Sequence, residues 1–517
     1  MSERPPKLPK HLYRVDQMPI LEQMAMKKLA LNTFDLMVLA GTAVFQILKS
    51  NYPLVNKLII FVGSGNNAGD GYIVAAKAKS AGMKVEVIQL NGNEKLSGIA
   101  MKAHEYAKSS GVETRSFDAD LLDGCSSHEE TLIVDAILGV GINKSVTGLY
   151  EKAILSINAA SHPVVSVDLP SGLNADTGRA MGIAVKADIT VSFIGLKQGL
   201  LTGEGQDYSG QVFFERFDIP DNVYSSESSP KPSSKRIDIN YVQGRLKPRK
   251  KSAHKGDHGH VVVLGGDKGF GGAGIMAAEA AQRAGAGLVT LVTRSEHKTA
   301  ALVRCPELMV IGEEDEKNWG GILNRASCIV VGPGLGTNEW GRSILSKVIE
   351  QKKINHTPVL FDADALTLLT ERENILKTFE THNAVFTPHP GEAARLLGCS
   401  TEFVESDRFR TVKELVKLLG GTCLLKGSGS LTSSEYAPDI IYLCSEGNAG
   451  MASGGMGDVL SGIVASLIAQ GLSCVDALNC GICIHGEAGD LASRANGERG
   501  LRATDLFPFL AKLLNTV

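Results

Sequence analysis

Short runs in which every residue is apolar, most of them ending at a glycine or an acidic residue, constrain the fold of this chain most. Leu58–Val62 is the clearest run in the first half, and Val261–Leu264 is the clearest in the second. A strand that is apolar at every position is covered on both faces, so these runs predict mainly parallel sheets between helix layers. Further strands, some of them with single polar positions, are expected at Val85–Leu90, Leu132–Val134, Val164–Val167, Ile189–Phe193, Leu288–Val292, Ile329–Val331, Val359–Phe361 and Ala384–Phe386. The pattern predicts an α/β fold.

A segment of serines, prolines and lysines at 225–235 interrupts this alternation. Residues of this kind cannot bury an apolar face, so we interpret the segment as a linker between domains 1–224 and 236–517. A chain of 517 residues is long enough for two domains of ordinary size. Because the two halves carry different motifs, we expect two different three-layer α/β/α domains joined in one chain.

The charge and hydropathy of the chain exclude several classes of partner. The formal net charge is −3 and the one basic run, Lys247–Lys251, is short, so we expect neither a nucleic acid nor a membrane surface as a partner. Met1–Lys10 lacks the apolar core of a signal peptide. Leu36–Leu48 is too short and too polar to span a bilayer, and we interpret it as a buried helix.

The nine cysteines are scattered and odd in number, which is typical of free thiols in a reducing compartment. We therefore predict a cytoplasmic protein. Cys480 and Cys483 are spaced like metal ligands, but no second pair of ligands occurs at similar spacing. We expect both cysteines to pack as small apolar residues inside a helix.

The Leu58–Val62 run leads into Gly63-Ser64-Gly65-Asn66-Asn67-Ala68-Gly69-Asp70-Gly71, and a helical pattern follows from Gly71 to Ala81. The small residues at 63, 65 and 68 fit the phosphate-binding turn of a Rossmann unit. A dehydrogenase would place an acidic ribose ligand after the next strand, but Asn91 follows Leu90. We therefore predict a Rossmann-like domain, and the missing acidic residue disfavours a dehydrogenase that transfers a hydride.

Two later strands of the first half also end at an acidic residue. Asp135 follows Leu132–Val134, and Asp168 follows Val164–Val167. Either aspartate alone could simply cap a turn. Because ligands bind beyond the carboxyl ends of parallel strands, the polar ends of three strands together favour a site. Asn67, Asp135 and Ser171 offer only oxygen ligands, which suits a hard cation rather than zinc.

The segments Gly65–Gly71, Asp135–Gly141 and Val167–Gly172 resemble the signatures of the NAD(P)H-hydrate epimerase domain, with Ala68 in place of the family's usual glycine. The resemblance implies that Asn67, Asp135 and Ser171 bind a potassium ion. It implies that Asp168 handles a proton during inversion at C6 of a hydrated nicotinamide ring. The implied substrates are the hydrates NADHX and NADPHX, contacted by Asn66, Asn67, Ala68, Gly69, Asp70, Gly139, Val140, Gly141, Ile142, Asn143, Lys144, Ser145 and Asp168.

In the second half, the segment Gly454-Gly455-Met456-Gly457-Asp458 precedes a stretch with one apolar stripe, which predicts a helix that ends at Gly471. Free N–H groups and the helix dipole at such a start favour an anion. Asp458 would repel a phosphate there, but it could accept a proton from a hydroxyl that attacks the phosphate. An aspartate that only complements the dipole is the alternative, although it does not explain the three glycines.

The second half contains further polar turns, at Gly265–Ala273, Val331–Gly336, Thr387–Glu392 and Lys426–Ser430. In this order, and with His254–Asp257, they resemble a ribokinase-like fold and, more narrowly, the ADP-dependent NAD(P)H-hydrate dehydratase family. The resemblance implies substrate contacts at Ala273, Gly336, His389, Pro390, Gly391, Glu392, Ala393, Ala394, Arg395 and Asp458. It implies that ADP is bound by Lys426, Gly427, Ser428, Gly429, Ser430, Asn448, Ala449, Gly450, Met451, Ala452, Ser453, Gly454, Gly455, Met456 and Gly457.

The same resemblance implies Asp458 as the base, ADP as phosphoryl donor and Mg²⁺ as the ion that neutralises the phosphates. We therefore predict a bifunctional repair enzyme, forming a homo-oligomer, that epimerises R- and S-NAD(P)HX. It then dehydrates the S form to NAD(P)H and releases AMP and phosphate. Two alternatives stay open: a vitamin-pathway kinase with a dinucleotide-sensing domain, and a first half that only binds its ligand. A stable phosphorylated product would support the kinase.

Overall fold

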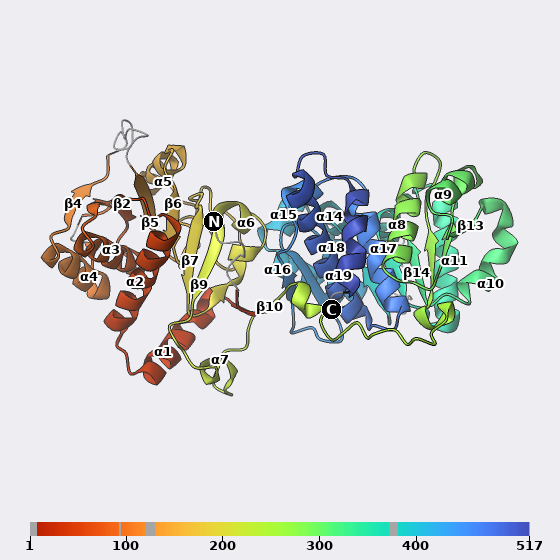
Figure 1. The fold of residues 1–517 in the computed structure, drawn as a ribbon, viewed down its shortest axis with the longest axis horizontal. Coiled ribbons are helices and arrows are strands. Elements are labelled where there is room, and N and C mark those ends of the chain that lie inside the picture. The colour runs from red at the N-terminus through yellow and green to blue at the C-terminus, as the bar shows by residue number, and fades with distance from the viewer. Residues whose placement is uncertain (1–7, 93–94, 119–129, 372–380, 516–517) are drawn as a thin grey trace. The chain divides into compact units, whose positions relative to one another are not determined.

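The computed structural model describes residues 8–92, 95–118, 130–371 and 381–515. The chain divides into two compact units, Met1–Lys235 and Arg236–Val517. Each unit has its own sheet with helices on both faces (Figure 1). The predicted α/β class with mainly parallel sheets is confirmed.

The sheet of the first unit is parallel throughout, in the order β4-β3-β2-β5-β6-β7-β9. Its strands are β2 (Lys57–Val62), β3 (Lys84–Gln89), β4 (Glu113–Ser116), β5 (Thr131–Ala136), β6 (Val164–Val167), β7 (Ile189–Phe193) and β9 (Gln211–Glu215). Strand order reverses between β2 and β5. The loops that follow the carboxyl ends of these two strands therefore diverge, and ligands of such sheets bind between them.

Both faces of this sheet are buried, as the uninterrupted apolar runs predict. Along β2, Leu58, Ile60 and Val62 face one core, while Ile59 and Phe61 face the other. The first core is covered by α1 (Met18–Leu29), α2 (Thr33–Asn51), α3 (Asn66–Ser80) and α4 (Gly98–Ser109), and the second is covered by α5 (Leu149–Ala159). Short helices α6 (Gly205–Ser209) and α7 (Asn222–Ser225) complete the unit.

Helix α3 begins at Asn66, five residues before the helical pattern recognised in the sequence at Gly71. The glycines at 69 and 71 are therefore helical rather than part of a turn. They permit close packing, because a Cβ atom on Gly71 would lie 2.6 Å from Cβ of Ala136, and one on Gly69 would lie 2.5 Å from Met37. This packing offsets the low helix propensity of glycine and extends the helix toward the sheet.

The segment 225–235 belongs to the first unit and differs from a free linker. The Ser233 amide donates to Leu12 O, and the hydroxyls of Ser233 and Ser234 lie 2.7 and 3.2 Å from Gln198 Oε1. Strand β1 (His11–Tyr13) pairs in parallel with β8 (Leu196–Lys197) and antiparallel with the start of β10 (Ser234–Ile237). Serine hydroxyls and backbone pairing, rather than an apolar face, hold this segment in place.

The sheet of the second unit runs in the order β13-β12-β11-β14-β15-β16-β17-β18-β19. Its strands are β11 (His260–Leu264), β12 (Leu288–Val292), β13 (Met309–Ile311), β14 (Cys328–Val331), β15 (Val359–Phe361), β16 (Ala384–Phe386), β17 (Thr422–Leu425), β18 (Ser430–Ser434) and β19 (Tyr442–Cys444). The strands from β13 to β17 are parallel, and β18 and β19 extend the sheet in antiparallel fashion.

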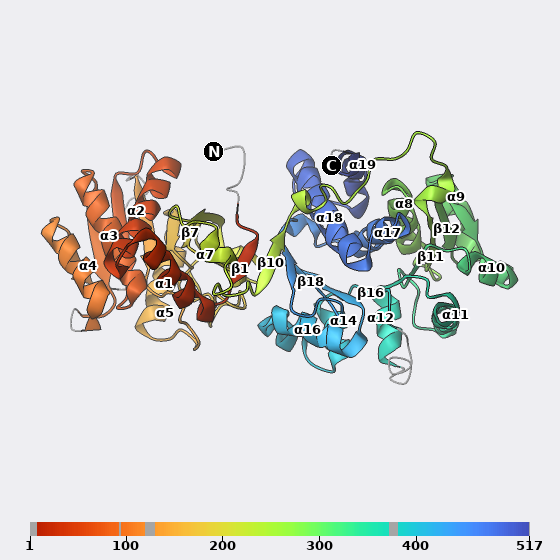
Figure 2. The same ribbon diagram turned by 90° about the horizontal axis from the view of Figure 1, so that it is seen from below.

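Helices cover both faces of this second sheet (Figure 2). One face carries α8 (Gly271–Arg283), α17 (Met456–Ala469), α18 (Cys474–Asn496) and α19 (Phe507–Asn515). The opposite face carries α11 (Glu339–Asn355), α12 (Ala363–Thr370), α14 (Pro390–Leu397) and α16 (Arg408–Leu419). Helices α9 (Lys298–Arg304), α10 (Trp319–Leu323) and α15 (Thr401–Ser406) are shorter. Cys480 and Cys483 are buried in α18, as expected.

Helix α2 has the length and composition of a membrane span, and among the described helices no other does. It is nevertheless part of the first core, where Leu36, Ala40, Val44 and Leu48 are buried. Core helices often have the length and composition of a membrane span, because the protein interior and the lipid bilayer both select apolar side chains. The interpretation of this segment as a buried helix is confirmed.

Candidate active sites

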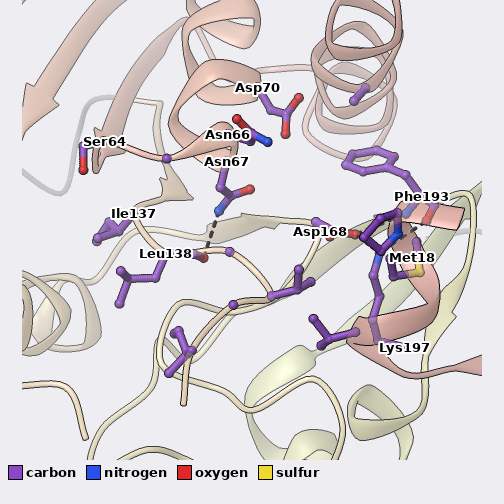
Figure 3. A pocket seen from close by; sticks show the side chains of 18 of the residues that line it. Met18, Ser64, Asn66, Asn67, Asp70, Ile137, Leu138, Asp168, Phe193 and Lys197 are labelled. Atoms are coloured by element: carbon purple, nitrogen blue, oxygen red, sulfur yellow. Dashed lines mark hydrogen bonds and ion pairs between the residues drawn. The ribbon is translucent and has the colours of Figure 1, made fainter. Parts of the chain in front are cut away.

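The first candidate site is a cavity of about 770 Å³ at the carboxyl edge of the first sheet. It is lined by α1, α2, the start of α3, the loop after β5 and the residues around Asp168 (Figure 3). The residues predicted from the sequence that line it are Asn66, Asn67, Asp70, Gly139, Val140, Gly141, Ile142, Asn143, Lys144, Ser145 and Asp168. Segments that lie far apart in the sequence thus converge on one cavity.

Ala68 and Gly69, also expected to contact the substrate, do not line this cavity. The Ala68 side chain is fully buried in the core, and the Cα of Gly69 faces Met37. Since α3 already begins at Asn66, its rotation turns these two positions away from the opening. Replacing the family's usual glycine by Ala68 therefore changes the core and not the cavity wall.

Of the predicted cation ligands, Asn67 lines this cavity, whereas Asp135 and Ser171 are buried behind it. Asp135 is fully buried: Ser171 Oγ donates to its Oδ1 at 2.5 Å, and Ser166 Oγ donates to its Oδ2 at 2.8 Å. The Leu138 carbonyl accepts from Asn67 Nδ2 at 3.0 Å and lies 3.2 Å from Ser171 Oγ. Burial raises the pKa of Asp135, and the hydrogen bonds from Ser171 oppose this shift.

Asp168 follows β6 in a left-handed conformation, with φ of 64°, which is unusual for a residue other than glycine. Its Oδ1 lies 2.5 Å from Nζ of Lys197, a side chain only 2% exposed. The same oxygen accepts from Ser192 Oγ at 3.1 Å and from the Phe193 amide at 3.3 Å. Oδ2 has no donor among the described residues. A fixed carboxylate with one uncommitted oxygen is suited to accept a proton.

Lys197 has no motif around it that could have indicated a role from the sequence. It follows β7 by a short turn, and only the fold brings its ammonium group to Asp168 (Figure 3). Two further carboxyls, Asp70 and Glu22, line the same cavity. Burial raises the pKa of both, and the negative charge of Asp168 adds to the shift.

The second candidate site lies at the start of α17, where the sequence predicts an anion site. Gly455 caps the helix with φ of 91°, and the helix begins at Met456. Gly454 has open space where a side chain would be, so a ligand could approach the backbone. Asp458 lies in the first turn, as expected. Burial raises the pKa of Asp458 to about 7, and the charge of Asp362 contributes further.

Lys426 stands opposite this helix start and is paired with Asp362. Its Nζ lies 2.8 Å from Asp362 Oδ1 and 3.8 Å from Glu392 Oε2. A Cβ atom on Gly457 would lie 3.3 Å from the same Nζ, so the loop and the helix start adjoin. Burial alone would lower the pKa of Lys426, but the charges of Asp362 and Glu392 raise it above its usual value.

Asp362 is absent from the residues singled out in the sequence. It follows β15, is 1% exposed, and accepts from Thr387 Oγ1 at 2.9 Å and from Ser461 Oγ at 2.8 Å. It therefore connects three elements around Asp458. The pattern of an acid directly after an apolar strand, which revealed Asp135 and Asp168, also occurs at Val359–Phe361 and could have identified it.

Arg408 contacts the backbone of the Lys426 loop, and no sequence motif indicated this role. Its guanidinium is buried, donates to Lys426 O at 3.1 Å and pairs with Glu405 at 2.8 Å. Gly427, with φ of 132°, would bring a Cβ atom within 3.0 Å of this guanidinium. A buried guanidinium that is paired with a carboxylate and donates to the loop backbone fixes the loop more firmly than the loop's own short side chains could.

The glycine-rich turns after β11 and β14 lie side by side at the same edge. The Asp267 amide donates to Gly334 O at 2.6 Å, and the Gly336 amide donates to Asp364 Oδ2 at 2.8 Å. A Cβ atom on Gly334 would lie 3.0 Å from that of Ala273, and one on Gly336 would lie 2.8 Å from Asp267. Ala273 and Gly336, which are predicted to contact the substrate, thus belong to two turns that pack against each other.

His389 caps α14, since its Nδ1 accepts from the Gly391 amide at 3.0 Å. Burial and the nearby Lys426 charge lower the pKa of His389, which favours the neutral ring that this cap requires. Of the expected contacts beyond it, Ala393 is fully buried and Ala394 is 5% exposed, so their side chains face the core. Glu392 points to Lys426 instead.

The loop 448–457, expected to bind ADP, is anchored at both ends. Asn448 Nδ2 donates to Asp490 Oδ1 at 2.9 Å, and the Gly447 amide donates to Asp490 Oδ2 at 3.0 Å. Ser453 Oγ donates to Leu501 O at 3.1 Å. Ala452, Ser453 and Gly454 are exposed between these anchors. An anchored loop with exposed amides can bind an anion without first becoming ordered.

These two sites define an α/β protein with a large cavity at the sheet edge of one unit and, in the other, a glycine-capped helix start with a buried carboxyl and a lysine beside it. Residues 261–512 match the family described as NAD(P)H-hydrate dehydratase, and residues 33–199 match the YjeF-related protein N-terminus. The bifunctional NAD(P)H-hydrate repair enzyme Nnr of Escherichia coli K12 is 41% identical over 515 residues, covering 100% of this chain and 96% of that protein. The chain belongs to the family of bifunctional NAD(P)H-hydrate repair enzymes.

Other relatives are similar over nearly the same length. The enzyme named Nnr in Coxiella burnetii is 40% identical over 507 residues, covering 98% of this chain and 99% of that protein. The enzyme of Leishmania braziliensis is 41% identical over 508 residues, covering 93% of this chain and 89% of that protein. A solved ADP/ATP-dependent NAD(P)H-hydrate dehydratase from Bacillus subtilis, co-crystallised with ATP and Mg²⁺, is 24% identical with a TM-score of 0.47, covering 54% of this chain and 96% of that chain.

Proposed function

We propose that the first unit interconverts R- and S-NAD(P)HX, and that the second unit dehydrates S-NAD(P)HX with ADP, yielding NAD(P)H, AMP and phosphate. The observation that carries this proposal is the match over the full chain to bifunctional repair enzymes. Each unit also has its own cluster of charged residues at the carboxyl edge of its sheet. The two activities form a sequence, because hydration produces both epimers and the second step uses one of them.

In the second unit, the exposed amides of loop 448–457 and the ammonium of Lys426 support binding of the ADP phosphates. Asp458 takes the proton of the C6 hydroxyl while that oxygen attacks the β-phosphorus, and AMP leaves. The C6–O bond then breaks, phosphate departs with its electron pair, and loss of a proton from C5 restores the ring double bond. Mg²⁺, when bound together with the nucleotide, would neutralise phosphate charge.

Asp458 suits this role because it is half-shielded from water and next to a cation. Its pKa of about 7 means that it can hold and release a proton near neutral pH. Lys426 remains charged, and its ion pair with Asp362 keeps it from neutralising Asp458 directly. The base and the phosphate-binding cation are thus separate groups.

In the first unit, the cavity volume and the loop 139–145 support a dinucleotide. Lys144 is the cation of this loop that could meet the pyrophosphate. We include in the proposal a potassium ion held by Asn67, Asp135 and Ser171. Their donor chemistry fits, since the three side chains offer carboxylate, hydroxyl and amide oxygens and are buried; Ser171 Oγ and Asn67 Nδ2 both contact the Leu138 carbonyl. The cation would add positive charge next to the cavity that the substrate occupies. We further propose a cytoplasmic homo-oligomer.

The test gives the purified chain an equal mixture of both hydrate epimers, with ADP, with ATP or with no nucleotide, and follows the absorbance of the reduced nicotinamide. We expect full recovery with the correct nucleotide. No recovery with either nucleotide would refute the dehydratase. A fast recovery of half the material, followed by a slow phase at the rate seen in buffer, would refute the epimerase. A phosphorylated product that accumulates would favour a kinase.

A further inference from the structure

The first cavity contains three carboxyls but one buried ammonium group, and their arrangement divides the carboxyls into two kinds. Asp168 is paired with Lys197, whereas Asp70 has no hydrogen bond or ion pair among the described residues. Figure 3 shows Asp70 extending from α3 on one side of the cavity, and Asp168 with Lys197 on the other. Asp168 therefore has a cationic partner, and Asp70 has none among the described residues.

We propose that Asp70 is the proton donor of the epimerase and that Asp168 is its proton acceptor, with Lys197 as the residue that keeps Asp168 charged. The inference rests on the proposed function of the first unit. It adds a catalytic role for Asp70, a positioning role for Lys197 and a reason why the two carboxyls differ.

The surroundings of Asp70 support its role as an acid. Groups that face it are the carboxyl of Glu22 on α1, the carboxyl of Asp168 after β6 and the ammonium of Lys197 on β8; α2 adds the apolar wall of Leu36, Met37 and Ala40. Burial raises the pKa of Asp70 well above its usual value, and the charge of Asp168 raises it further. Lys197 opposes the shift but is already committed to Asp168, 2.5 Å away.

The surroundings of Asp168 support the opposite role. Its Oδ1 takes three donors, from Lys197, Ser192 and the Phe193 amide. These bonds stabilise the ion and fix its orientation, while Oδ2 stays available for a proton. The left-handed backbone at Asp168 indicates that the surrounding structure holds the residue in this position against a local energetic cost.

Such a pair can invert a carbon that bears both a hydroxyl group and a ring nitrogen. Asp168 takes the proton of the C6 hydroxyl, and the oxygen forms a carbonyl with C6. The C6–N1 bond breaks, its electron pair goes to N1, and Asp70 gives its proton to N1. After rotation about the C5–C6 bond, N1 adds to the other face of the carbonyl, its proton returns to Asp70, and Asp168 returns a proton to the oxygen. No atom or electron is gained or lost.

The experiment measures epimerisation of each pure epimer without nucleotide, so that the second unit is silent, in the full chain and in Asp70→Asn, Asp168→Asn and Lys197→Gln. We expect both aspartate variants to lose about 10²-fold or more in kcat/KM. Asp70→Asn should also remove the fall in rate at high pH that marks loss of a required acid. Lys197→Gln should lower kcat at least about tenfold with little change in KM. Asp207→Asn, an exposed residue outside the cavity, is the control.

Asp70→Asn keeps the shape of the side chain and removes a poorly solvated carboxyl, so it should fold; thermal unfolding checks this. If the unmodified chain does not accelerate epimerisation, the proposed function of this unit fails. If it does, while Asp70→Asn stays within about threefold of it or loses only substrate affinity, the role of Asp70 is refuted alone. A Lys197→Gln effect confined to KM would refute the positioning role.

Discussion

Lys426 and Asp362 form a nearly buried ion pair, with Nζ 2.8 Å from Oδ1, at the centre of the second unit's site. The two residues lie 64 positions apart in the sequence. Asp362 also accepts hydrogen bonds from Thr387 and Ser461, so one carboxylate ties the Lys426 loop to α17, the helix that carries Asp458. The relative positions of the phosphate-binding cation and the base therefore depend on a residue that need not touch either substrate.

Removing this carboxylate should damage the site and the stability of the unit together. Asp362→Ala leaves Lys426, Thr387 and Ser461 without their common acceptor, and breaking a buried pair in this way typically costs about 3–5 kcal/mol. Ser461→Ala removes one donor and should cost about 1 kcal/mol. Urea unfolding of both variants measures the difference. Equal stability of Asp362→Ala and the unmodified chain would contradict the role assigned to this pair.

Asp458→Asn should lower ADP-dependent recovery of NAD(P)H by about 10²–10⁴-fold, because the amide cannot accept the hydroxyl proton. Epimerisation measured on the same protein should stay unchanged, since it takes place in the other unit. This second activity is the control for folding and concentration. A variant that recovers NAD(P)H at the normal rate would exclude Asp458 as the base.

The rate of dehydration should depend on the charge of Asp458. Burial raises the pKa of Asp458 to about 7, and a base works only when it is deprotonated. We expect kcat/KM to fall tenfold per pH unit below about pH 7 and to level off above it. A profile recorded from pH 5 to 9 at saturating ADP measures this. If kcat/KM stays constant down to pH 5, Asp458 is not the group whose deprotonation the reaction requires.

The same shift predicts that Asp458 lowers the stability of the unit. A carboxyl whose folded pKa is raised is favourable to folding at low pH, and this contribution is lost as the pH rises from about 4 to about 7. Asp458→Asn should therefore stabilise the unit by on the order of 2 kcal/mol at pH 8, and by much less at pH 4. Thermal unfolding at both pH values tests the sign. A lower Tm of the variant at pH 8 would contradict it.

Epimerisation should depend on potassium, through Asn67, Asp135 and Ser171. Ser171→Ala removes a hydroxyl that lies 2.5 Å from Asp135 and should raise the half-saturating potassium concentration by about tenfold or more. Rates measured in potassium, in lithium and in a bulky organic cation at constant ionic strength give this value. If the unmodified chain is equally fast in all three salts, the potassium site is refuted.

Several elements could be predicted from the sequence because their signals are local. The apolar runs at β6, β7, β12, β15 and β16 coincide with the strands residue for residue. Burial on both faces selects mainly apolar residues, with only small hydroxyl side chains such as Ser166 and Thr190 between them, so the pattern stands out from the polar segments around it. The start of α17 was likewise predictable, because glycines, an acid and an apolar stripe occur within one short window.

Other features could not be predicted from the sequence, because packing decides them. Helix α3 starts at Asn66 rather than Gly71, because close contacts with Ala136 and Met37 favour glycine inside the helix. Ala68 and Ala393 face the core, since the rotation of a helix determines which of its residues meet a ligand. The segment 225–235 is bound to the first unit through serine hydroxyls, a form of attachment that composition does not reveal.

The sequence by itself determined the two α/β units, the helix start at Gly454–Asp458 and the family. These follow from motifs in which the informative residues are neighbours, so no knowledge of distant contacts is needed. Only the tertiary structure decided that Lys197 pairs with Asp168 and that Asp362 pairs with Lys426. Such pairs depend on strand order and helix rotation, which arise from the packing of the whole unit and not from the order of neighbouring residues.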